Sequence, residues 1–525
     1  MTVPASGERV PDVTVVTAVY NTMPYLTRCL TSLVEQTIGR DRLEIVAVDD
    51  GSTDGSGREL ERFARLHPGT VKVLSQSNSG GPAGPSNRAL DVATGRYVFF
   101  IGSDDYLGPE ALERLVAAAD RWDADVVLGR MRGVNSRNIH QAIFGSTREE
   151  VDLFTSPLPF SLSNTKLFRR ELIERHKLRY PEDMPVGSDQ PFTIEACYRA
   201  KRVSVLADYD YYYAVRRLNA RNITYASRHL ERLRCAEALV GFVAGLIEEG
   251  PRRDAVLLRH FAWEVARLLE DDVLGLDRAT QEAVHAGVRA LAVRHLTDRI
   301  RDGLDIDARV RLGVARHGGV DDLLAVIRQD AELGVPPAVR DGDRWYAGYP
   351  GFRSPELDIP DAWFDVTDHA AAWLARLDTV SVDFEGARAL TVTARSPRPD
   401  LSELTSGVKL GAGVTLGTTT EVVPDATGTT VRARIPLAGL LADVAPGGEL
   451  RLVQAHVDAL GGTGVAPLRG PRRPTPRRAV VRRGASLHVL TATTNHKGQL
   501  VVAVAPVTPR RLMARLRRRL PLGGK

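Results

Sequence analysis

The succession of short apolar runs in the N-terminal part of the chain constrains the fold more than any other feature. Three β-branched runs, Asp12–Tyr20, Leu43–Val48 and Val71–Leu74, are typical of buried parallel strands. Between the first two lies Tyr25–Gln36, whose leucines and valine recur at helical spacing. The pattern therefore predicts a strand–helix–strand unit.

The same alternation continues along the chain. It predicts helices over Arg58–Leu66, Ser86–Ala93 and Pro109–Asp120 and a strand over Tyr97–Ile101. Alternating strands and helices indicate a doubly wound, Rossmann-like α/β domain. The full length of 525 residues suggests about three folded units.

The pattern changes twice after this domain. Long helical periodicities over Leu230–Ile247, Ala255–Leu274 and Arg278–Leu333 indicate a helical linker. From about Trp345, regular short alternating segments with turn signals between them predict one or two β-sandwich modules. The expected strands are Val380–Phe384, Leu390–Ala394, Thr429–Ile435, Leu450–His456 and Ser486–Leu490. The basic, proline-rich Gly470–Arg483 is expected to be an exposed crossing rather than a strand.

These sequence patterns divide the chain into four expected parts. They are an α/β domain over residues 1–227, a helical linker over 228–340, β-sandwich modules over 341–505 and a basic amphipathic tail over 506–525.

Bulk composition excludes several protein classes. Apolar residues at 43% and charged residues at 26% are ordinary globular values, which argues against wholesale disorder and against a membrane protein. The N-terminus lacks the regions of a signal peptide, so we expect a cytoplasmic location. Cys29, Cys197 and Cys235 lie far apart and are expected to be structural thiols.

The net charge of +5 is unevenly distributed, because Thr508–Lys525 carries seven basic residues and no acid. Leucines and a methionine at helical spacing among these arginines are typical of an interfacial amphipathic helix, although a disordered basic tail fits equally. The tail and the loop Arg472–Arg483 could contact a phosphate polymer or the anionic inner face of the cell membrane. Nucleic acid is not expected, since aromatic interleaving and reader motifs are missing.

Polar residues follow the predicted strands where ligands bind in such sheets. Asp49 and Asp50 precede a glycine turn, and the carboxylates could accept hydrogen bonds from a base or ribose. Asp54 also reads as a turn or helix-cap residue. Ser103, Asp104 and Asp105 follow Gly102, and adjacent carboxylates favour a divalent cation clamped to a diphosphate, although they could equally cap the next helix.

Four segments together resemble the family 2 glycosyltransferases of the GT-A fold. They are VTVVTAVYNTMPYLTRCLTSLVEQT, EIVAVDDGSTDGS, NSGGPAGPSNRALDVATGRYVFFIGSDDYL and VGSDQPFTIEA, in the order and spacing of that family. The resemblance covers about residues 11–225. It implies that a nucleotide-sugar is held by Thr17, Ala18, Tyr20, Asp50, Asn78, Gly80, Pro85, Asn87, Arg88 and Ser103.

The resemblance also implies the catalytic groups. Asp104 matches the metal-binding carboxylate for Mn²⁺ or Mg²⁺, with Gly102 where many members have a first aspartate. Asp189 matches the acceptor-side aspartate and is the candidate base of an inverting transfer, with Ser188 replacing a glutamate. The alternative is that Asp189 only caps a helix over Gln190–Ala200.

Tyr211–Thr224 resembles the segment that closes the donor site in many members. Arg216 is the first candidate for a phosphate contact there, and Arg221 is the second. An arginine run can equally be a solvated surface.

The layout of transferase, linker and β-modules resembles the wall teichoic acid glycosyltransferases that decorate poly(ribitol phosphate). That resemblance implies immunoglobulin-like C-terminal modules, a homotrimer, an anionic polymer acceptor and UDP-N-acetylglucosamine or another UDP-hexose as donor. Two alternatives stay open. One is a transferase for another glycan, lipid-linked or small-molecule acceptor, and the other is an inactive carbohydrate-binding or scaffold protein, for which Gly102 and Ser188 argue. A dehydrogenase is excluded because no Gly-x-Gly-x-x-Gly turn follows the first strand.

Overall fold

The computed structural model describes residues 10–135, 137–217, 229–334, 336–442, 444, 448–470, 475–484, 486–495 and 498–507. The chain forms two compact units, Met1–Ala308 and Arg309–Lys525, and each is described by itself. The expected tail over residues 508–525 lies outside the described residues. The four-part division of the chain stays a prediction.

A seven-stranded sheet forms the centre of the first unit, in the order β3-β2-β1-β4-β8-β6-β9. All pairs are parallel except those that β8 makes with β4 and β6. The strands are β1 (Val13–Val19), β2 (Leu43–Asp49), β3 (Val71–Ser75), β4 (Tyr97–Phe100), β6 (Val126–Gly129), β8 (Leu167–Arg169) and β9 (Val203–Leu206). Strands β1 and β2 are almost wholly buried, as parallel strands covered on both faces require. The prediction of a buried strand is wrong for β3, which lies at the edge of the sheet and is buried only at Val71.

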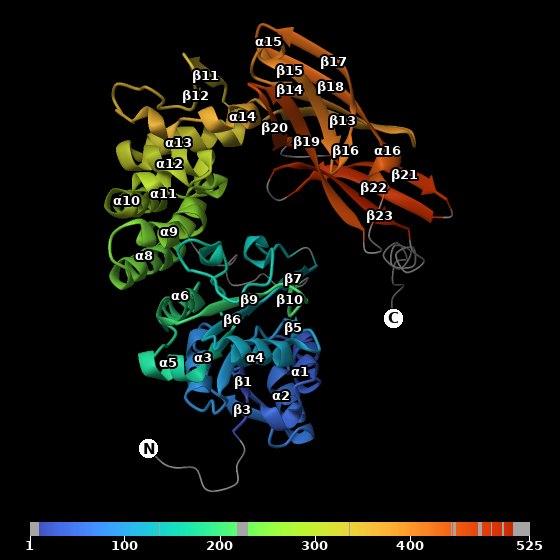
Figure 1. The fold of residues 1–525 in the computed structure, drawn as a ribbon. Coiled ribbons are helices and arrows are strands. Elements are labelled where there is room, and N and C mark those ends of the chain that lie inside the picture. The colour runs from blue at the N-terminus through green and yellow to red at the C-terminus, as the bar shows by residue number, and fades with distance from the viewer. Residues whose placement is uncertain are drawn as a thin grey trace, which may run out of the picture. The chain divides into compact units, whose positions relative to one another are not determined.

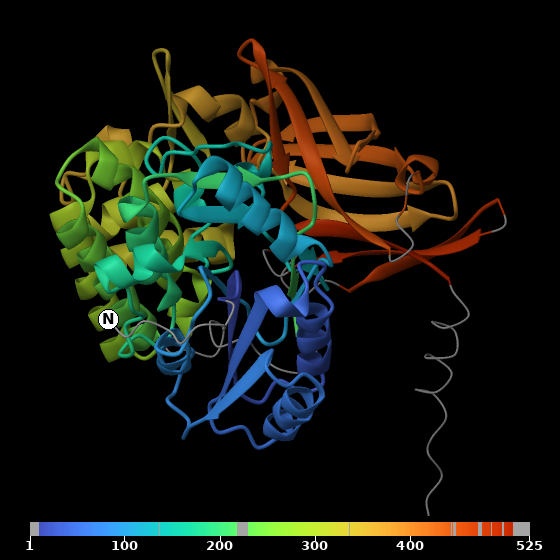
Figure 2. The same ribbon diagram turned by 60° about the horizontal axis from the view of Figure 1, so that its bottom comes forward.

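Helices cover both faces of this sheet, which confirms the predicted α/β arrangement. They are α1 (Tyr25–Val34), α2 (Ser56–Leu66), α3 (Ala83–Leu90) and α4 (Ala111–Trp122). Helix α3 lies on one side of β1, and α1 and α2 lie on the other (Figures 1 and 2). Helix α3 begins before the predicted Ser86 because Pro85 falls in the first turn, where its missing N–H is tolerated.

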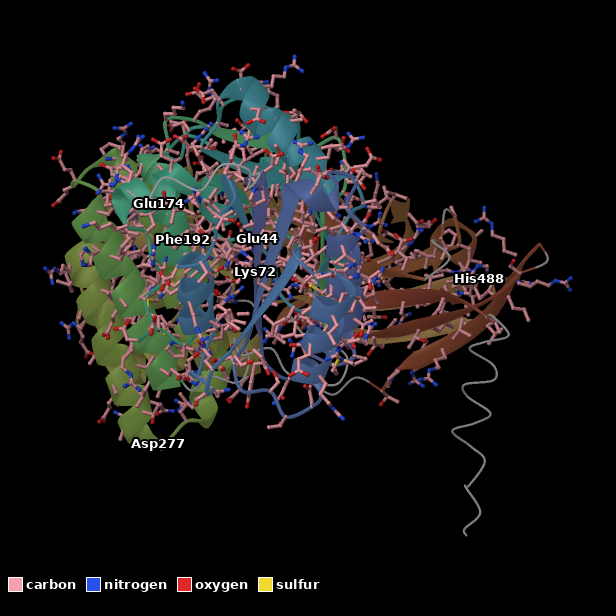
Figure 3. The ribbon with its side chains drawn as sticks, turned by 90° about the horizontal axis from the view of Figure 1, so that it is seen from below. Glu44, Lys72, Glu174, Phe192, Asp277 and His488 are labelled. Carbon is pink, nitrogen blue, oxygen red and sulfur yellow. The ribbon has the colours of Figure 1, made fainter. Side chains whose placement is uncertain are left out.

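A buried carboxylate ties the first three strands together. Glu44 on β2 accepts hydrogen bonds from the Thr14 hydroxyl (2.5 Å) and the Thr94 N–H (2.9 Å), and it pairs with Lys72 on β3 (2.5 Å; Figure 3). Burial alone would raise the pKa of Glu44, but these hydrogen bonds lower it below its ordinary value. The paired charge keeps this end of the sheet in register.

A three-stranded sheet and two helices complete the α/β part. The strands are β5 (Tyr106–Leu107), β10 (Tyr212–Val215) and β7 (Met131–Val134), in that order. The helices are α5 (Arg170–His176) and α6 (Asp189–Arg199), and short 3₁₀ turns occupy Arg40–Arg42, Ala142–Phe144 and Leu158–Phe160 (η3). Strand β10 returns the chain beside the segment that follows β4.

The helical segment of this unit is less regular than its periodicity predicts. Its α-helices are α8 (His229–Leu246), α9 (Pro251–His260), α10 (Arg278–His295) and α11 (Asp298–Asp302). The predicted helix over Ala255–Leu274 breaks into α9, a π-helical turn at Phe261–Val265 (η4) and 3₁₀ turns at Ala266–Leu269 (η5) and Asp271–Gly275 (η6). In the described ranges, every helix is too short or too polar to span a membrane.

The described residues of the second unit form a few helices, one two-stranded hairpin and two larger antiparallel sheets. Helix α12 (Ile306–His317) crosses the boundary and is followed by α13 (Val320–Arg328), the π turn η7 (Gln329–Leu333), the hairpin β11 (Ala338–Asp341) and β12 (Arg344–Ala347), and α14 (Ala370–Leu374). One sheet contains β13 (Asp378–Glu385), β14 (Ala389–Ser396), β18 (Gly428–Pro436) and β17 (Thr418–Asp425). The other contains β16 (Thr415–Leu416), β15 (Thr405–Ala412), β19 (Glu449–Ala459), β23 (Leu500–Pro506), β22 (Ser486–Thr494) and β21 (Arg477–Arg483), with β20 (Gly462–Pro467) on β19. The expected C-terminal β-modules are confirmed.

The prediction for the basic segment Gly470–Arg483 is wrong over its second half. Residues Arg477–Arg483 form β21, which pairs antiparallel with β22 at the edge of the larger sheet. Only Val481 of this strand is buried, and the arginines around it are exposed. An edge strand tolerates charge on its open side, and the charge protects that edge from pairing with other chains.

Candidate active site

The polar strand ends predicted from the sequence meet at one edge of the parallel sheet. Val19 at the end of β1 is paired with Asp49 at the end of β2, and Asp49 is paired with Ser75 at the end of β3. The N–H of Ile101, just after β4, donates to the Val16 carbonyl (3.0 Å). The residues that follow β1, β2, β3 and β4 therefore lie at one edge of the sheet, beyond which the ligand crevice of such sheets is found.

Asp50 is the most strongly bound carboxylate at this edge. It is buried, with 3% of its surface exposed. Its Oδ1 accepts from Gln76 Nε2 (2.7 Å), and both of its oxygens lie 3.1 Å from the Ser79 N–H. The Ser79 hydroxyl donates to Oδ2 (3.0 Å). These contacts fix the orientation of the carboxylate and leave it lone pairs for a further donor.

The loop after β3 approaches the turn after β2 very closely. A Cβ at Gly51 would lie 2.9 Å from the backbone nitrogen of Asn78, and Gly51 has a left-handed φ of +79°. Asn78 Oδ1 accepts from the Gly80 N–H (2.8 Å), which turns this loop back on itself. Asn78 and Gly80, both predicted donor-site residues, are exposed on it. Only glycine satisfies both constraints at position 51.

The residues at the end of β1 present different surfaces to the crevice. The Thr17 hydroxyl is buried and, within the described part of the chain, has no hydrogen-bond partner. Ala18 is partly exposed and the Tyr20 ring is 48% exposed. Asp54 bonds the Ser56 N–H (3.0 Å) and hydroxyl at the start of α2, which matches its interpretation as a local turn residue.

Two predicted donor-site residues on α3 bond backbone groups of neighbouring segments. The Asn87 amide accepts from the Tyr180 N–H (2.8 Å) and donates to the Tyr180 carbonyl (2.9 Å). Arg88 donates to the Ser75 carbonyl at the end of β3 (2.7 Å). Asn87 thus holds the segment that precedes α6, and Arg88 holds the end of β3. Their predicted contact with a nucleotide-sugar stays a prediction.

The segment after β4 brings two carboxylates together. The Ser103 hydroxyl is buried against that of Thr22 (2.9 Å). Asp105 is buried, and it accepts from the Tyr212 hydroxyl (2.5 Å) and the Val215 N–H (2.6 Å). Burial, together with the nearby Asp104, raises the pKa of Asp105 to about 7. Asp104 points to the partly exposed side of the pair and is the carboxylate available to a ligand.

Gly102 is crowded by these carboxylates. A Cβ there would lie 2.9 Å from Asp105 Oδ2 and 3.2 Å from Asp104 Oδ1. The Gly102 N–H also donates to the Tyr212 hydroxyl (3.1 Å). The carboxylate of Asp105 therefore occupies the side on which an aspartate at position 102 would project.

The partner of Asp104 is an arginine that the sequence analysis did not select. Arg217 Nε donates to Asp104 Oδ2 (2.7 Å), and both side chains are mostly buried. The side chain of Arg216 is exposed, and its N–H bonds the Val134 carbonyl on β7 (3.2 Å). Arg221 lies outside the described residues. The contact of Arg216 with phosphate stays a prediction.

Asp189 is the first residue of α6, and Ser188 takes the cap position without a side-chain capping bond. Phe192 anchors this helix in an aromatic cluster with Tyr180, Phe168 and Phe100, at ring distances of 4.6–5.4 Å. Burial raises the pKa of Asp189, while Arg259, the Asn164 N–H and Lys166 oppose that rise. A partly exposed carboxylate with a raised pKa is suited to accept a proton.

Lys166 and Arg259 are two further site residues that sequence reasoning missed. Burial lowers the pKa of Lys166 to about 8, and Lys166 Nζ donates to the Ser161 carbonyl (2.6 Å). Neither residue belongs to a motif, and Arg259 comes from the helical segment well beyond α6. Only their burial identifies them, since a buried cation requires a partner.

Comparisons with known proteins agree with this geometry. Residues 14–177 match the model of glycosyl transferase family 2, and residues 234–327 match that of the glycosyl transferase TarS linker domain. The family 2 match includes Asp50 and Asp104 and ends before Asp189. The predicted GT-A domain is thereby confirmed.

Curated relatives are similar over the N-terminal part. A poly(ribitol-phosphate) beta-glucosyltransferase of Bacillus spizizenii is 40% identical over 205 residues, which are 39% of this chain and 32% of the relative. The poly(ribitol-phosphate) beta-N-acetylglucosaminyltransferase TarS of Staphylococcus aureus is 39% identical over 203 residues, 39% of this chain and 35% of the relative. The matched part spans about a third of each relative's length.

Solved structures extend the similarity of the fold. S. aureus TarS 1-349 in complex with UDP-GlcNAc is 28% identical with a TM-score of 0.57, covering 65% of this chain and 97% of that one. A second structure, S. aureus TarS, is 21% identical with a TM-score of 0.60, covering 95% of this chain and 86% of that one, which supports the fold alone.

Proposed function

We propose that this chain, whose residues 14–177 form a glycosyl transferase family 2 domain, is an inverting glycosyltransferase that decorates a cell-envelope polymer. The donor is a UDP-sugar, UDP-N-acetylglucosamine or another UDP-hexose. The acceptor is a hydroxyl of a poly(ribitol phosphate)-type teichoic acid. The observation that carries the proposal is the single sheet edge at which Asp50 follows β2 and the Asp104–Asp105 pair follows β4, the two parallel strands that flank β1.

The nucleotide is assigned to the turn after β2 and the end of β1. Asp50 is held rigidly by Ser79 and Gln76, and its remaining lone pairs can accept a hydrogen bond from a base N–H. Among the described residues, the buried Thr17 hydroxyl on β1 has no hydrogen-bond partner and can both donate and accept. A buried polar group without a partner costs about 1–3 kcal/mol, which a bound ligand would recover.

The residues after β4 fit a divalent metal that arrives with the donor, not a metal held by protein alone. Across the described ranges, no group of three or more His, Cys, Asp or Glu side chains could hold a metal ion. Mg²⁺ and similar ions are commonly bound by one or two carboxylates together with substrate phosphates, and Asp104 can supply one carboxylate. Mn²⁺ or Mg²⁺ there would neutralise the charge of the diphosphate leaving group.

Arg217 gives Asp104 a cationic partner in the absence of that metal. A guanidinium has five N–H donors, so Arg217 can turn from the carboxylate to a phosphate oxygen when a donor binds. Tyr212 and the Val215 N–H meanwhile hold Asp105. The protein therefore keeps this acidic segment folded without metal and has a basic side chain ready for the diphosphate.

Asp189 is assigned the role of general base. The acceptor hydroxyl attacks the anomeric carbon, a new C–O bond forms, and the bond from that carbon to the diphosphate breaks. The hydroxyl proton passes to Asp189, and UDP leaves with the bonding electrons. A single displacement inverts the anomeric configuration, and a positioned base of this kind contributes about 10²–10⁴ in rate.

The proposal is tested by UDP release from a panel of UDP-sugars with poly(ribitol phosphate), with and without Mn²⁺. We expect turnover of one donor that needs metal and acceptor and is lost in Asp104→Ala and Asp189→Ala. The control is Asp298→Ala, an exposed aspartate on α11 that should leave the rate unchanged. Turnover only with other acceptors would overturn the teichoic acid assignment, and no turnover or donor binding would favour a carbohydrate-binding protein.

A further inference from the structure

A buried ion pair from the helical segment lies against the start of α6. Arg259 on α9 is 8% exposed at its side chain and pairs with Glu264 Oε2 (2.7 Å). Arg259 Nη1 also donates to Gln190 Oε1, and Gln190 is the residue after Asp189. Helices α6, α8 and α9 pack together in the same unit (Figure 1). The segment that carries Asp189 is thus bonded to a residue of the segment 234–327, which matches the TarS linker domain model.

The pairing of Arg259 with Glu264 depends on an irregular turn. Five residues are about 1.4 turns of an α-helix, so side chains at this spacing point in different directions. Phe261–Val265 is π-helical, and the Ala266 N–H donates to the Phe261 carbonyl five residues earlier. The wider turn brings positions five apart onto one side. Insertions of this kind are frequent at functional sites.

Glu264 also contacts the other two members of this cluster, Gln190 and His260. It accepts from Gln190 Nε2 (3.4 Å) and lies 3.1 Å from His260 Nδ1. Burial lowers the pKa of His260, so the imidazole is neutral at physiological pH. Burial raises the pKa of Glu264, but Arg259, His260 and Gln190 together hold it below its ordinary value. The cluster therefore contains one cation and one anion.

Three elements present charged or titratable groups to Asp189. Arg259 comes from α9, Lys166 from the segment before β8, and Tyr180 from the segment before α6. Arg259 exerts the largest effect that stabilises the ionised carboxylate, and Asp189 in turn stabilises the charged form of Arg259. Glu264 moderates that effect because it neutralises part of the charge of Arg259.

We propose that Arg259 is a positioning residue for Asp189, held by Glu264 across the π-helical turn, so that the linker segment completes the catalytic site. This inference rests on the proposed function of Asp189 as the base. Arg259 fixes the first turn of α6 through Gln190 and sets the charge that the Asp189 carboxylate meets. Arg259 lies in the segment 234–327 that matches the TarS linker domain model, whereas Asp189 precedes that segment.

The two members of the ion pair are expected to act in opposite directions. Arg259→Met removes a positive charge, so Asp189 keeps its proton to higher pH and the acid limb of kcat moves up. Glu264→Gln leaves the charge of Arg259 unneutralised, so Asp189 loses its proton at lower pH and the acid limb moves down. A structural defect alone would lower the rate without opposite shifts.

The experiment measures kcat for sugar transfer by the full chain from about pH 5 to pH 9 at saturating donor and acceptor. We expect opposite shifts of the acid limb in the two variants. In Arg259→Met, kcat should fall on the order of tenfold to a hundredfold, because the base is misplaced. Arg259→Lys should return the acid limb toward the parent position. Arg252→Met, an exposed cation on the same helix over Phe154, is the matched control and should leave the profile unchanged.

Each outcome has one meaning. Unchanged pH profiles in both variants of an active enzyme would overturn the positioning role and leave the proposed function intact. Lack of transfer by the parent chain at every pH would overturn the proposed function and this inference with it. UDP binding by each variant is measured in parallel, and if Arg259→Met does not fold, the direction of the shift in Glu264→Gln decides.

Discussion

Gly51 approaches Asn78 so closely that even an alanine at position 51 should destabilise the turn after β2. Gly51→Ala forces an L-residue into a left-handed conformation, which costs roughly 1–2 kcal/mol. It also places a Cβ 2.9 Å from a backbone nitrogen that cannot rotate away, which adds about 1–3 kcal/mol of overpacking. We therefore expect the β2 amides to lose about 2–5 kcal/mol of protection against hydrogen exchange. The loop that carries Asn78 should also move.

Gly69→Ala is the matched control for this change. Gly69 has φ +81°, nearly the value of Gly51, but nothing lies within 4 Å of its added Cβ. It precedes β3 at the opposite end of that strand from the crevice. Gly69→Ala should therefore show only the backbone cost of roughly 1–2 kcal/mol.

Hydrogen exchange of the β2 amides measures the loss of protection, and titration calorimetry measures UDP binding. UDP affinity should fall about tenfold, or about 1.4 kcal/mol, in Gly51→Ala and stay unchanged in Gly69→Ala. Equal loss of protection in the two variants, with UDP affinity unchanged in both, would refute the argument that this contact shapes the nucleotide site.

Three further predictions follow from single contacts. Arg217→Met should weaken UDP binding several-fold, because the diphosphate loses the basic side chain beside Asp104; unchanged UDP affinity in a calorimetric titration would contradict this. Asn87→Ala should speed amide hydrogen exchange at Tyr180 by an amount that corresponds to a loss of about 1–3 kcal/mol of local stability. Unchanged exchange would contradict the role of Asn87 in holding the Tyr180 backbone. Burial lowers the pKa of Lys166 to about 8, so the folded chain binds fewer protons than the unfolded chain between about pH 8 and pH 10.5. The free energy of unfolding should therefore increase with pH across that window. Lys166→Met should reduce the slope of unfolding free energy against pH.

The sheet and its ligand edge could be predicted because they depend on local patterns. Buried parallel strands must be continuous apolar runs, so β1, β2 and β4 are visible in the sequence, and their carboxyl ends fall on one edge. Asp50 and Asp104 follow directly from that order. Helix boundaries shifted by a few residues where prolines fall in a first turn.

The partners of those residues could not be predicted in the same way. Arg216 and Arg217 are adjacent, and neighbouring residues of an extended chain point to opposite sides. The sequence alone does not say which side faces Asp104. Arg259 is harder still, because its pairing with Glu264 requires a π-helical turn that apolar periodicity does not reveal. The exposed arginines of β21 made the sequence look like a loop, although an edge strand tolerates charged side chains.

The inverting mechanism is tested most directly by following the product of sugar transfer by proton NMR, with UDP-N-acetylglucosamine as donor and poly(ribitol phosphate) as acceptor. A single displacement predicts a β-linked sugar formed from the α-linked donor by the parent chain. It also predicts a rate about 10²–10⁴ lower in Asp189→Asn with UDP binding retained. An α-linked product, or an Asp189→Asn variant that transfers sugar at the parent rate, would contradict the single-displacement mechanism and the role of Asp189 as its base.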